Sequence, residues 1–237
     1  MIFMIYTLRI QRQHTSSSAP YWQEFTYEGS GSDSIATVLR TLNERMPLQT
    51  KEGLAASPIG WQCSCMVRKC GACAMVINGI PRLACAAFLR DLRQSVITIA
   101  PLRKFPVIHD LIVDRTVLQT LMKQLKIWRT TESTPSLWTQ ELHRQSSRCL
   151  LCGCCLEICP NFEGQAAFAG ALAPVNAFRI LDGTTHDSHI QACTAAYASL
   201  YYEQCGHSLS CQTVCPAHIP IDELLAHSNA IAVWHKP

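Results

Sequence analysis

The chain has 237 residues, enough for one large or two small domains. Hydrophobic residues make up 48% of it and charged residues only 16%, below the usual quarter, which suggests that partner proteins cover part of the surface. The formal net charge of +3 is too small to argue for a nucleic-acid partner, and no apolar run reaches the roughly 18 residues of a membrane span.

The sequence begins with a pattern of strands and one helix. Residues 5–12 alternate apolar and polar side chains, as a half-buried strand does, and residues 21–27 alternate again as its hairpin partner. Asp33 or Ser34 can cap a helix over the residues that follow. The apolar positions of this helix have helical spacing: Ile35, Val38, Leu39 and Leu42. Two strands, a helix and a cysteine-rich loop predict the β-grasp order of a ferredoxin.

Cysteine is the most informative residue type. The chain has 14 cysteines, and all but Cys193 fall into three groups along the sequence. A secreted disulfide scaffold is usually short and has scattered pairs, so this grouping indicates metal binding in a reducing compartment. Cys193 is interpreted as a packing residue.

The first group has the spacing Cys65-x4-Cys70-x2-Cys73, with Cys85 as a distant fourth cysteine. This is the plant-type [2Fe–2S] spacing. The long first loop lets backbone N–H groups point at the cluster sulfides and help to set the reduction potential. Cys63 is interpreted as a small buried or neighbouring thiol rather than a ligand.

The chain changes character after this group. Residues 75–81 predict a strand that turns at Asn78-Gly79, a strong hairpin dipeptide, and residues 96–99 predict a last strand. Pro101 and Pro106 mark a boundary. Apolar residues then recur near helical spacing between Leu111 and Leu125. The sequence therefore predicts one domain over residues 1–104 and a second over 105–237.

The second domain is predicted to be helical. Helices are expected at residues 166–172 and 189–203, and His186 and His189 are interpreted as surface histidines. Its central motif is Cys149-Leu-Leu-Cys152-Gly-Cys154-Cys155-Leu-Glu-Ile-Cys159-Pro160, which reads C-x2-C-x2-C-x3-C-P. This is the bacterial ferredoxin run, whose fourth cysteine ligates a different cluster.

Further cysteines follow as Cys205-x5-Cys211-x3-Cys215-Pro216 and supply the ligands that a second cluster needs. Zinc is the main rival, but a zinc ribbon needs only two C-x2-C knuckles, which the run exceeds. Cys154 breaks the register of the run and has no assigned role.

A plant-type module followed by a bacterial-type two-cluster module resembles the iron–sulfur subunit of the succinate dehydrogenase and fumarate reductase family. The segment from Ser64 to Asp91 is similar to that family's first cluster segment, and residues 105–114 resemble its inter-domain linker. The resemblance looks closer to fumarate reductases. It implies an α+β protein with an N-terminal β-grasp plant-type [2Fe–2S] ferredoxin domain and a C-terminal α-helical bacterial-type two-cluster ferredoxin domain.

The resemblance also implies three sets of cluster ligands. The [2Fe–2S] ligands would be Cys65, Cys70, Cys73 and Cys85. The [4Fe–4S] ligands would be Cys149, Cys152, Cys155 and Cys215. The [3Fe–4S] ligands would be Cys159, Cys205 and Cys211.

A role in electron transfer follows from the same resemblance. The chain would relay single electrons between the FAD of a flavoprotein subunit, where succinate and fumarate interconvert, and a quinone held by membrane-anchor subunits that can carry haem. It would lie peripherally on the cytoplasmic or mitochondrial matrix face of the energy-coupling membrane, and would itself supply no catalytic acid or base. Two alternatives remain open: a free soluble ferredoxin-like carrier, or the iron–sulfur subunit of another flavoprotein oxidoreductase.

The sequence departs from the family in the first cluster loop. Met66 and Arg68 stand where the family usually has arginine and glycine. Glycine permits unusual backbone angles, so the loop is expected to be reshaped. If Arg68 faces the cluster, its positive charge would raise the reduction potential.

Two further departures lie in the second domain. The tryptophan that follows the Cys-Pro turn in the dehydrogenases is absent, and the usual histidine after Cys205 stands one place later. Pro160, His207 and Ser208 are therefore candidate quinone-binding residues, with loop packing as the alternative. A complete ferredoxin half would need a ligand at position 208, and a serine hydroxyl replaces a thiolate poorly, which predicts a three-iron cluster.

Overall fold

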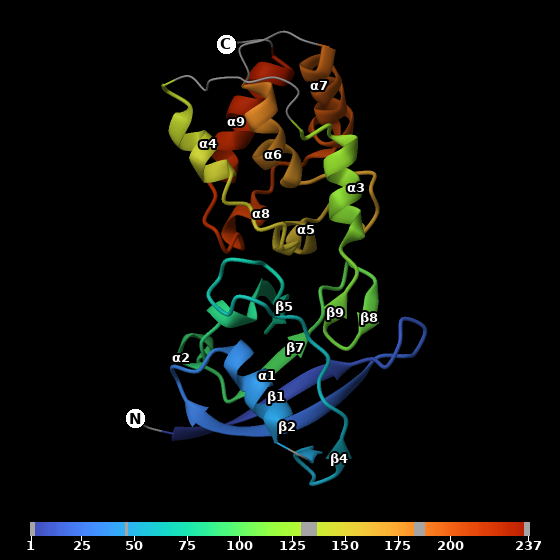
Figure 1. Cartoon of the computed structure of the whole chain (residues 1–237), viewed down its shortest axis with the longest axis vertical. Helices are drawn as coiled ribbons and strands as arrows, with labels where there is room; N and C mark the ends of the chain where they lie inside the picture. Colours follow the sequence, from blue (N-terminus) through green and yellow to red (C-terminus); the bar gives the residue numbers. More distant parts are fainter. Residues whose placement is uncertain (1–2, 46, 129–136, 183–187, 235–237) are drawn as a thin grey trace. The chain divides into compact units, whose positions relative to one another are not determined.

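The computed structural model describes residues 3–45, 47–128, 137–182 and 188–234. The chain divides into two compact units, Met1–Asp114 and Arg115–Pro237. The first unit is built around a β-sheet and the second is helical (Figure 1). Within the described residues, no helix is both long and apolar enough to cross a membrane.

The sheet of the first unit has the strand order β2-β1-β7-β5-β6. Its strands are β1 (Phe3–Arg12), β2 (Tyr21–Ser30), β5 (Ala74–Ile77), β6 (Ile80–Leu83) and β7 (Val96–Ala100). The first and last of these strands lie side by side and pair in parallel, whereas the other neighbours pair antiparallel. The predicted strands at 5–12 and 21–27 are confirmed and extend further than expected.

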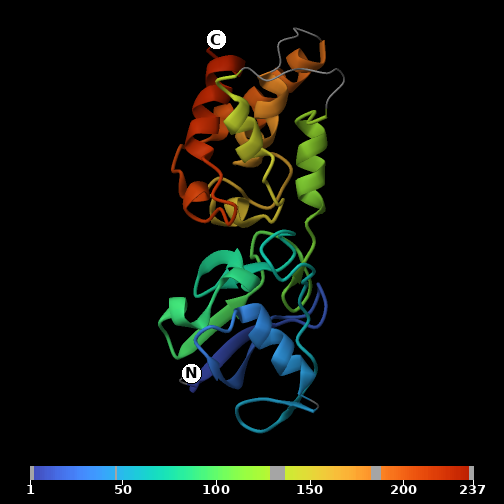
Figure 2. The same cartoon turned by 60° about the vertical axis from the view of Figure 1, so that its left-hand side comes forward.

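Helix α1 (Ile35–Glu44) is capped as predicted. The Ser34 hydroxyl accepts the backbone N–H of Thr37 at 3.2 Å, which satisfies one of the free donors at the helix start. The four apolar positions expected on its inner face are all buried. Figures 1 and 2 show α1 against one face of the sheet. Its apolar stripe therefore forms part of the core of this unit.

The predicted turn between β5 and β6 is also confirmed. Asn78 and Gly79 have φ angles of +49° and +79°, the left-handed pair that a two-residue hairpin needs. Shorter elements complete the unit. These are β3 (Leu48–Gln49), β4 (Ala55–Ala56), the 3-10 helix η1 (Ala84–Ala86) and α2 (Leu89–Leu92).

A small hairpin follows β7, so residues 96–99 are not the last strand. It consists of β8 (Val107–His109) and β9 (Ile112–Val113), and Leu111 lies in it rather than in a helix. Its turn residue Asp110 forms a buried ion pair of 3.0 Å with Arg12 of β1. This pair holds the hairpin to the first unit, which ends at Asp114 rather than at the predicted boundary after residue 104.

The second unit is formed by helices around α6 (Leu172–Leu181), which is buried along nearly its whole length. Helix α6 contacts α3, α4, α7 and α9. The bounds of the surrounding elements are α3 (Thr116–Gln124), α4 (Gln140–Ser146), α5 (Cys154–Ile158), α7 (Ser188–Leu200), η2 (Tyr202–Gln204), α8 (Ser210–Thr213) and α9 (Ile221–Ala232). Figure 2 shows α6 among these helices.

The predicted helix at 166–172 is wrong, because α6 begins only at Leu172. Gly170 has a φ of +50°, and a Cβ there would meet Leu156 at 2.5 Å, so the chain turns at this point instead of continuing a helix. The helix at 189–203 is confirmed in substance as α7 and η2. His189 lies in α7, where its Nε2 is 2.7 Å from the carbonyl of Trp128, and His186 lies outside the described residues.

Candidate metal centres

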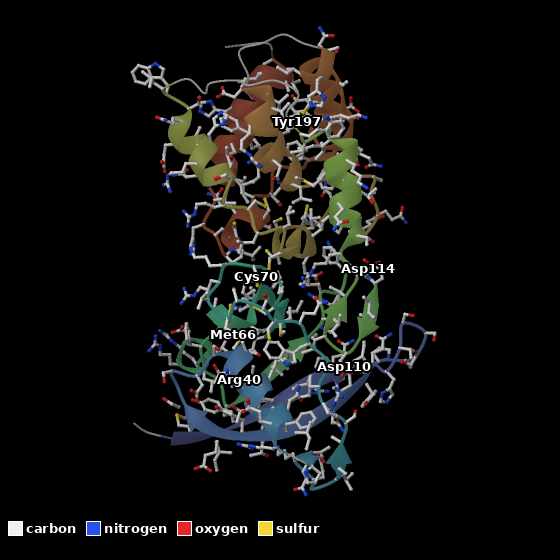
Figure 3. The ribbon with its side chains drawn as sticks, in the orientation of Figure 1. Arg40, Met66, Cys70, Asp110, Asp114 and Tyr197 are labelled. Carbon is white, nitrogen blue, oxygen red and sulfur yellow. The ribbon has the colours of Figure 1, made fainter. Side chains whose placement is uncertain are left out.

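Three cysteines of the first group, Cys65, Cys70 and Cys73, lie on the loop before β5. Figure 3 labels Met66 and Cys70 on this loop. The Cys65 sulfur accepts the N–H groups of Val67 at 3.4 Å and of Lys69 at 3.1 Å. These backbone hydrogen bonds are the largest cause that lowers the pKa of Cys65 to about 7, with help from Cys70. The loop thus favours a thiolate at Cys65, as a metal ligand requires.

The other two cysteines of this group stand at the start of β5 and in η1. Burial raises the pKa of Cys73 to about 12, and its side chain is hydrogen-bonded with that of Cys85 and lies near Cys70. The N–H of Ala84 donates to the Cys73 carbonyl at 3.0 Å and fixes the two segments together. The four predicted [2Fe–2S] residues therefore lie near one another: Cys65 is close to Cys70, and Cys73 is close to both Cys70 and Cys85.

The sign of the backbone φ angle alternates along the first cluster loop. Met66 and Arg68 have φ angles of +57° and +61°, the left-handed region in which a non-glycine residue costs roughly 1–2 kcal/mol. Such alternation turns successive N–H groups to one side and forms a concavity for anions. Arg68 thus adopts the conformation that glycine would take most easily. Its exposed guanidinium lies 5.5 Å from the ring of Phe88.

The second group lines one cavity. It is lined by Cys149, Cys152, Cys155 and Cys215, together with apolar residues of α6 and of the segment before α9. Burial, and then the neighbouring thiols of this set, raise the pKa of Cys155. A thiol in such surroundings loses its proton when a metal binds it.

The third group lines a separate cavity. Its cysteines are Cys159, Cys205 and Cys211. Burial, with the charges of the other two cysteines, raises the pKa of Cys211 to about 11. The predicted quinone-binding residues line the same cavity and are exposed: Pro160, His207 and Ser208.

Each of the two cavities of the second unit combines cysteines from two segments of the chain. The ferredoxin run contributes Cys159 to the third group, and the C-terminal segment contributes Cys215 to the second. Ala171 lines both cavities, and the charge of Cys211 reaches Cys155. Segments far apart in the sequence therefore build each cavity.

The two halves of this unit repeat one loop geometry. The residues on either side of Cys152 have φ angles of +48° and +88°, and those on either side of Ser208 have +52° and +53°. A short helix follows each loop, α5 in one half and α8 in the other. Cys152 and Ser208 each stand three residues after the first cysteine of their half. Ser208 thus occupies the position that Cys152 has in the other half.

The remaining three cysteines differ in their surroundings. Cys63 is exposed beside a hollow that Arg40 and Trp61 also line, and Arg40 is labelled in Figure 3. Cys193 is fully buried in α7, in agreement with a packing role. Cys154 is fully buried as well, and a hydrogen bond from its side chain is the main cause that lowers the pKa of Cys152 to about 7.

These donor sets fit iron–sulfur clusters. Within the part of the chain that the structure describes, no three His, Cys, Asp or Glu residues surround a point where a single ion could sit. A single ion needs its ligands around one point, whereas the thiolates of a cluster bind different iron atoms. Sets of four, four and three thiols, the last two around cavities with apolar walls, are the ligand chemistry of such clusters.

Comparison with known proteins decides the family. The family described as "2Fe-2S iron-sulfur cluster binding domain" matches residues 7–120. The succinate dehydrogenase iron–sulfur subunit of Bacillus subtilis is 33% identical over 236 residues, which cover 93% of this chain and 89% of that one. The chain belongs to the family of succinate dehydrogenase and fumarate reductase iron–sulfur subunits.

A further relative and a solved structure are also similar to this chain. The fumarate reductase iron–sulfur subunit of Wolinella succinogenes is 27% identical over 239 residues, covering 93% of this chain and 94% of that one. The fold is similar to a chain of the Mycobacterium smegmatis Sdh1 complex, with a TM-score of 0.77, 21% identity, and coverage of 98% and 97% of the two chains. The higher identity to a succinate dehydrogenase gives no support to the expected closer likeness to fumarate reductases.

Proposed function

We propose that this chain is the electron-transfer subunit of a membrane-bound succinate:quinone or quinol:fumarate oxidoreductase. The observation that carries the proposal is the gathering of eleven cysteines into sets of four, four and three, in a chain of this family. Iron–sulfur clusters held by these sets would accept and release one electron at a time. The chain would relay electrons between the FAD of a flavoprotein subunit and a quinone.

The proposed ligand sets follow the three groups. Cys65, Cys70, Cys73 and Cys85 would hold a [2Fe–2S] cluster in a β-grasp ferredoxin domain. Cys149, Cys152, Cys155 and Cys215 would hold a [4Fe–4S] cluster. Cys159, Cys205 and Cys211 would hold a [3Fe–4S] cluster in the same bacterial-type domain. The shared wall at Ala171 supports direct electron transfer between the last two, because only a thin layer of protein separates the two cavities.

The chain would hold the clusters, shield them from water and tune their reduction potentials. Backbone N–H groups at Cys65 stabilise negative charge on sulfur, and the apolar walls around Cys155 keep water away. The exposed side of the third cavity supports a quinone site at Pro160, His207 and Ser208. His207→Ala should then slow electron transfer to quinone without changing the iron content, and unchanged quinone kinetics would exclude His207.

The proposal extends to the assembly. A flavoprotein subunit with FAD would receive or supply electrons at one end, and anchor subunits with quinone and haem would do so at the other, on the cytoplasmic or matrix face of the membrane. Co-purification separates this from a free soluble carrier, since a subunit purifies with a flavoprotein and a carrier purifies alone. A flavoprotein partner without succinate–quinone activity would favour another oxidoreductase.

The third cluster gives the sharpest test. We expect an oxidised three-iron EPR signal in the purified complex, because the side chain at the fourth corner is the Ser208 hydroxyl. Ser208→Cys places a thiol at the position of Cys152 in the other half, so it should abolish this signal and yield a four-iron centre of lower potential.

Ser210→Cys is the matched control. It adds a thiol to the same loop at the position equivalent to Cys154, which the proposal does not count as a ligand. The three-iron signal should therefore persist in this variant. A wild-type centre with four irons, or loss of the three-iron signal in both variants, would contradict the proposed site.

A further inference from the structure

The cysteines of the third cavity come from two segments that are far apart in sequence. Cys159 follows α5, whereas Cys205 follows η2 and Cys211 lies in α8. Two residues of the cavity lining, Pro160 and Ser208, are exposed to solvent. A cluster in this cavity would therefore join two segments at an exposed place, and its retention would depend on how firmly the protein itself holds the segments together.

A tight turn fixes Asn161 to the first segment. The N–H of Phe162 donates to the carbonyl of Cys159 at 3.4 Å and closes a four-residue turn. Pro160 is the second residue of this turn, which its fixed φ angle suits, and Asn161 is the third. The side chain of Phe162 is fully buried and anchors the turn. The position of the Asn161 side chain is therefore tied to that of Cys159.

The second segment is fixed around Tyr201. The ring of Tyr201 is buried and stacks with that of Phe168, with the ring centroids 6.2 Å apart. The Tyr201 carbonyl accepts the N–H groups of Gln204 at 3.1 Å and of Cys205 at 2.9 Å. Gln204 and the neighbouring Cys205 are therefore held by a residue that is itself packed in the interior.

Two side-chain amides join these segments. The Asn161 Nδ2 donates to the carbonyl of Gln204. The Gln204 Nε2 donates in turn to the carbonyls of Ala167 at 3.0 Å and Ser199 at 2.8 Å. Gln204 thus contacts the first segment twice, through its carbonyl and through its side chain. A carbonyl oxygen can only accept, so each of these contacts needs the N–H of an amide.

We infer that Asn161 and Gln204 are positioning residues that hold Cys159 and Cys205 at the separation that the third cluster requires. A turn fixes one amide and a buried ring fixes the other, so the bonds between the segments limit how far the two thiols can move apart. The inference rests on the proposed function, because it takes these cysteines as ligands. It assigns the retention of the cluster to two residues outside all three ligand sets.

The test measures cluster loss in the assembled complex. Asn161→Asp and Gln204→Glu keep the shape of the side chain but replace the donating nitrogen by an oxygen that only accepts when ionised. After a chelator is added, the oxidised three-iron EPR signal should decay roughly three- to tenfold faster than in the wild type, as expected from the loss of one hydrogen bond. The four-iron signal, recorded in reduced samples, should decay at the wild-type rate.

Gln165→Glu is the matched control. Gln165 is exposed and lies between Asn161 and Ala167 in sequence, so this variant adds the same charge to the same segment but keeps both amides. Its three-iron signal should decay as in the wild type. Wild-type decay in Asn161→Asp and Gln204→Glu overturns the inference. Equal acceleration of the four-iron signal also overturns it, because this would indicate a general loss of structure, as does acceleration in Gln165→Glu.

The ligand set is checked separately with Cys205→Ser. If this variant keeps a normal three-iron signal, the proposed function fails at this site, whatever the two amides do. If Cys205→Ser loses the signal while Asn161→Asp and Gln204→Glu decay like the wild type, the cluster site stands and the positioning role alone is wrong.

Discussion

Replacing Asp110 with asparagine tests how the first unit holds the β8–β9 hairpin. The Asp110 side chain, labelled in Figure 3, is fully buried and lies 3.0 Å from the fully buried guanidinium of Arg12. Its two oxygens also accept the N–H groups of Gln13 at 2.9 Å and Gly60 at 2.8 Å. Asp110 has a φ of +48°, which asparagine tolerates, so the substitution mainly removes the charge and one acceptor oxygen.

The expected loss is large for a single substitution. Removing one partner of a buried ion pair costs about 3–5 kcal/mol, because the remaining charge is uncompensated. Arg12 keeps the side-chain oxygen of Gln23 at 2.7 Å and the carbonyls of Ser57 at 3.2 Å and Pro58 at 3.0 Å. We therefore expect the low end, about 3 kcal/mol. With a urea dependence of about 1–3 kcal/mol per M, the midpoint should fall by roughly 1–3 M.

Urea unfolding of the cluster-loaded chain, followed by far-ultraviolet circular dichroism and by cluster absorbance, measures this loss. Glu44→Gln is the control, since it breaks the Arg40–Glu44 pair of 3.7 Å, in which both side chains are more than half exposed. An exposed pair contributes about 1 kcal/mol at most. If Asp110→Asn loses no more than this control, the buried pair does not hold the hairpin and the reasoning is refuted.

The Asp110 carboxylate also makes the stability of the fold depend on pH. Burial alone would raise the pKa of Asp110, but hydrogen bonds from Arg12, Gly60 and Gln13 outweigh it and hold the pKa below its usual value. Because the folded-state pKa is lowered, the stabilisation is complete above the unfolded value of about 3.9 and is lost as pH falls through the folded-state value. The gap between wild type and Asp110→Asn should therefore be constant near neutral pH and close only below about pH 4.

Two further predictions concern other contacts. Arg68→Gly relieves a left-handed residue but removes an exposed contact with Phe88, so the two effects on stability should nearly cancel. Because the guanidinium is exposed, we expect a shift in the [2Fe–2S] potential well below the 59 mV or so that marks a tenfold effect, and a larger shift would show that Arg68 acts on the cluster. Asp182→Asn weakens the bond of 2.7 Å to His143 that joins α4 to the end of α6. Hydrogen exchange in α4 should accelerate by a factor that corresponds to about 1–3 kcal/mol, and unchanged exchange would mean that packing alone holds α4.

Local signals explain which elements the sequence predicted. The strands at 5–12 and 21–27 are half-buried, so alternation revealed them, and α1 has both an apolar stripe and the cap at Ser34. The turn at Asn78-Gly79 was visible because few dipeptides adopt two left-handed angles easily. In each case the residues that determine the element are adjacent in sequence.

The sequence-based predictions differ from the structure where contacts between residues far apart in sequence determine the local conformation. Residues 105–114 looked like a linker, yet Asp110 is bound by Arg12 and Gly60, and neither partner can be inferred from the hairpin itself. Residues 166–172 are rich in alanine and favour a helix, but the close approach of Leu156 to Gly170 imposes a turn. Tertiary packing overrides local preference at both places.

The spacing of the cysteines reflects the reach of a short loop around a cluster, which is a local property, and it showed three groups along the sequence. The cavities combine residues from different groups, since Cys215 lies with the first three cysteines of the run and Cys159 lies with Cys205 and Cys211. These are the sets that the family resemblance implies.

The loop around Ser208 holds two residues in the left-handed conformation, which costs free energy. In the first half one of the two left-handed positions is Gly153, whereas in the second half they are His207 and Leu209. A non-glycine residue held there costs about 1–3 kcal/mol and persists only when its surroundings impose it. The Cys205 N–H donates to the Tyr201 carbonyl at 2.9 Å, and the Asn161 side chain donates to the carbonyl of Gln204, so both ends of the segment before the loop are fixed. Since the residues that flank position 208 have left-handed angles like those that flank Cys152, a cysteine there should complete a four-iron site by a change of side chain alone.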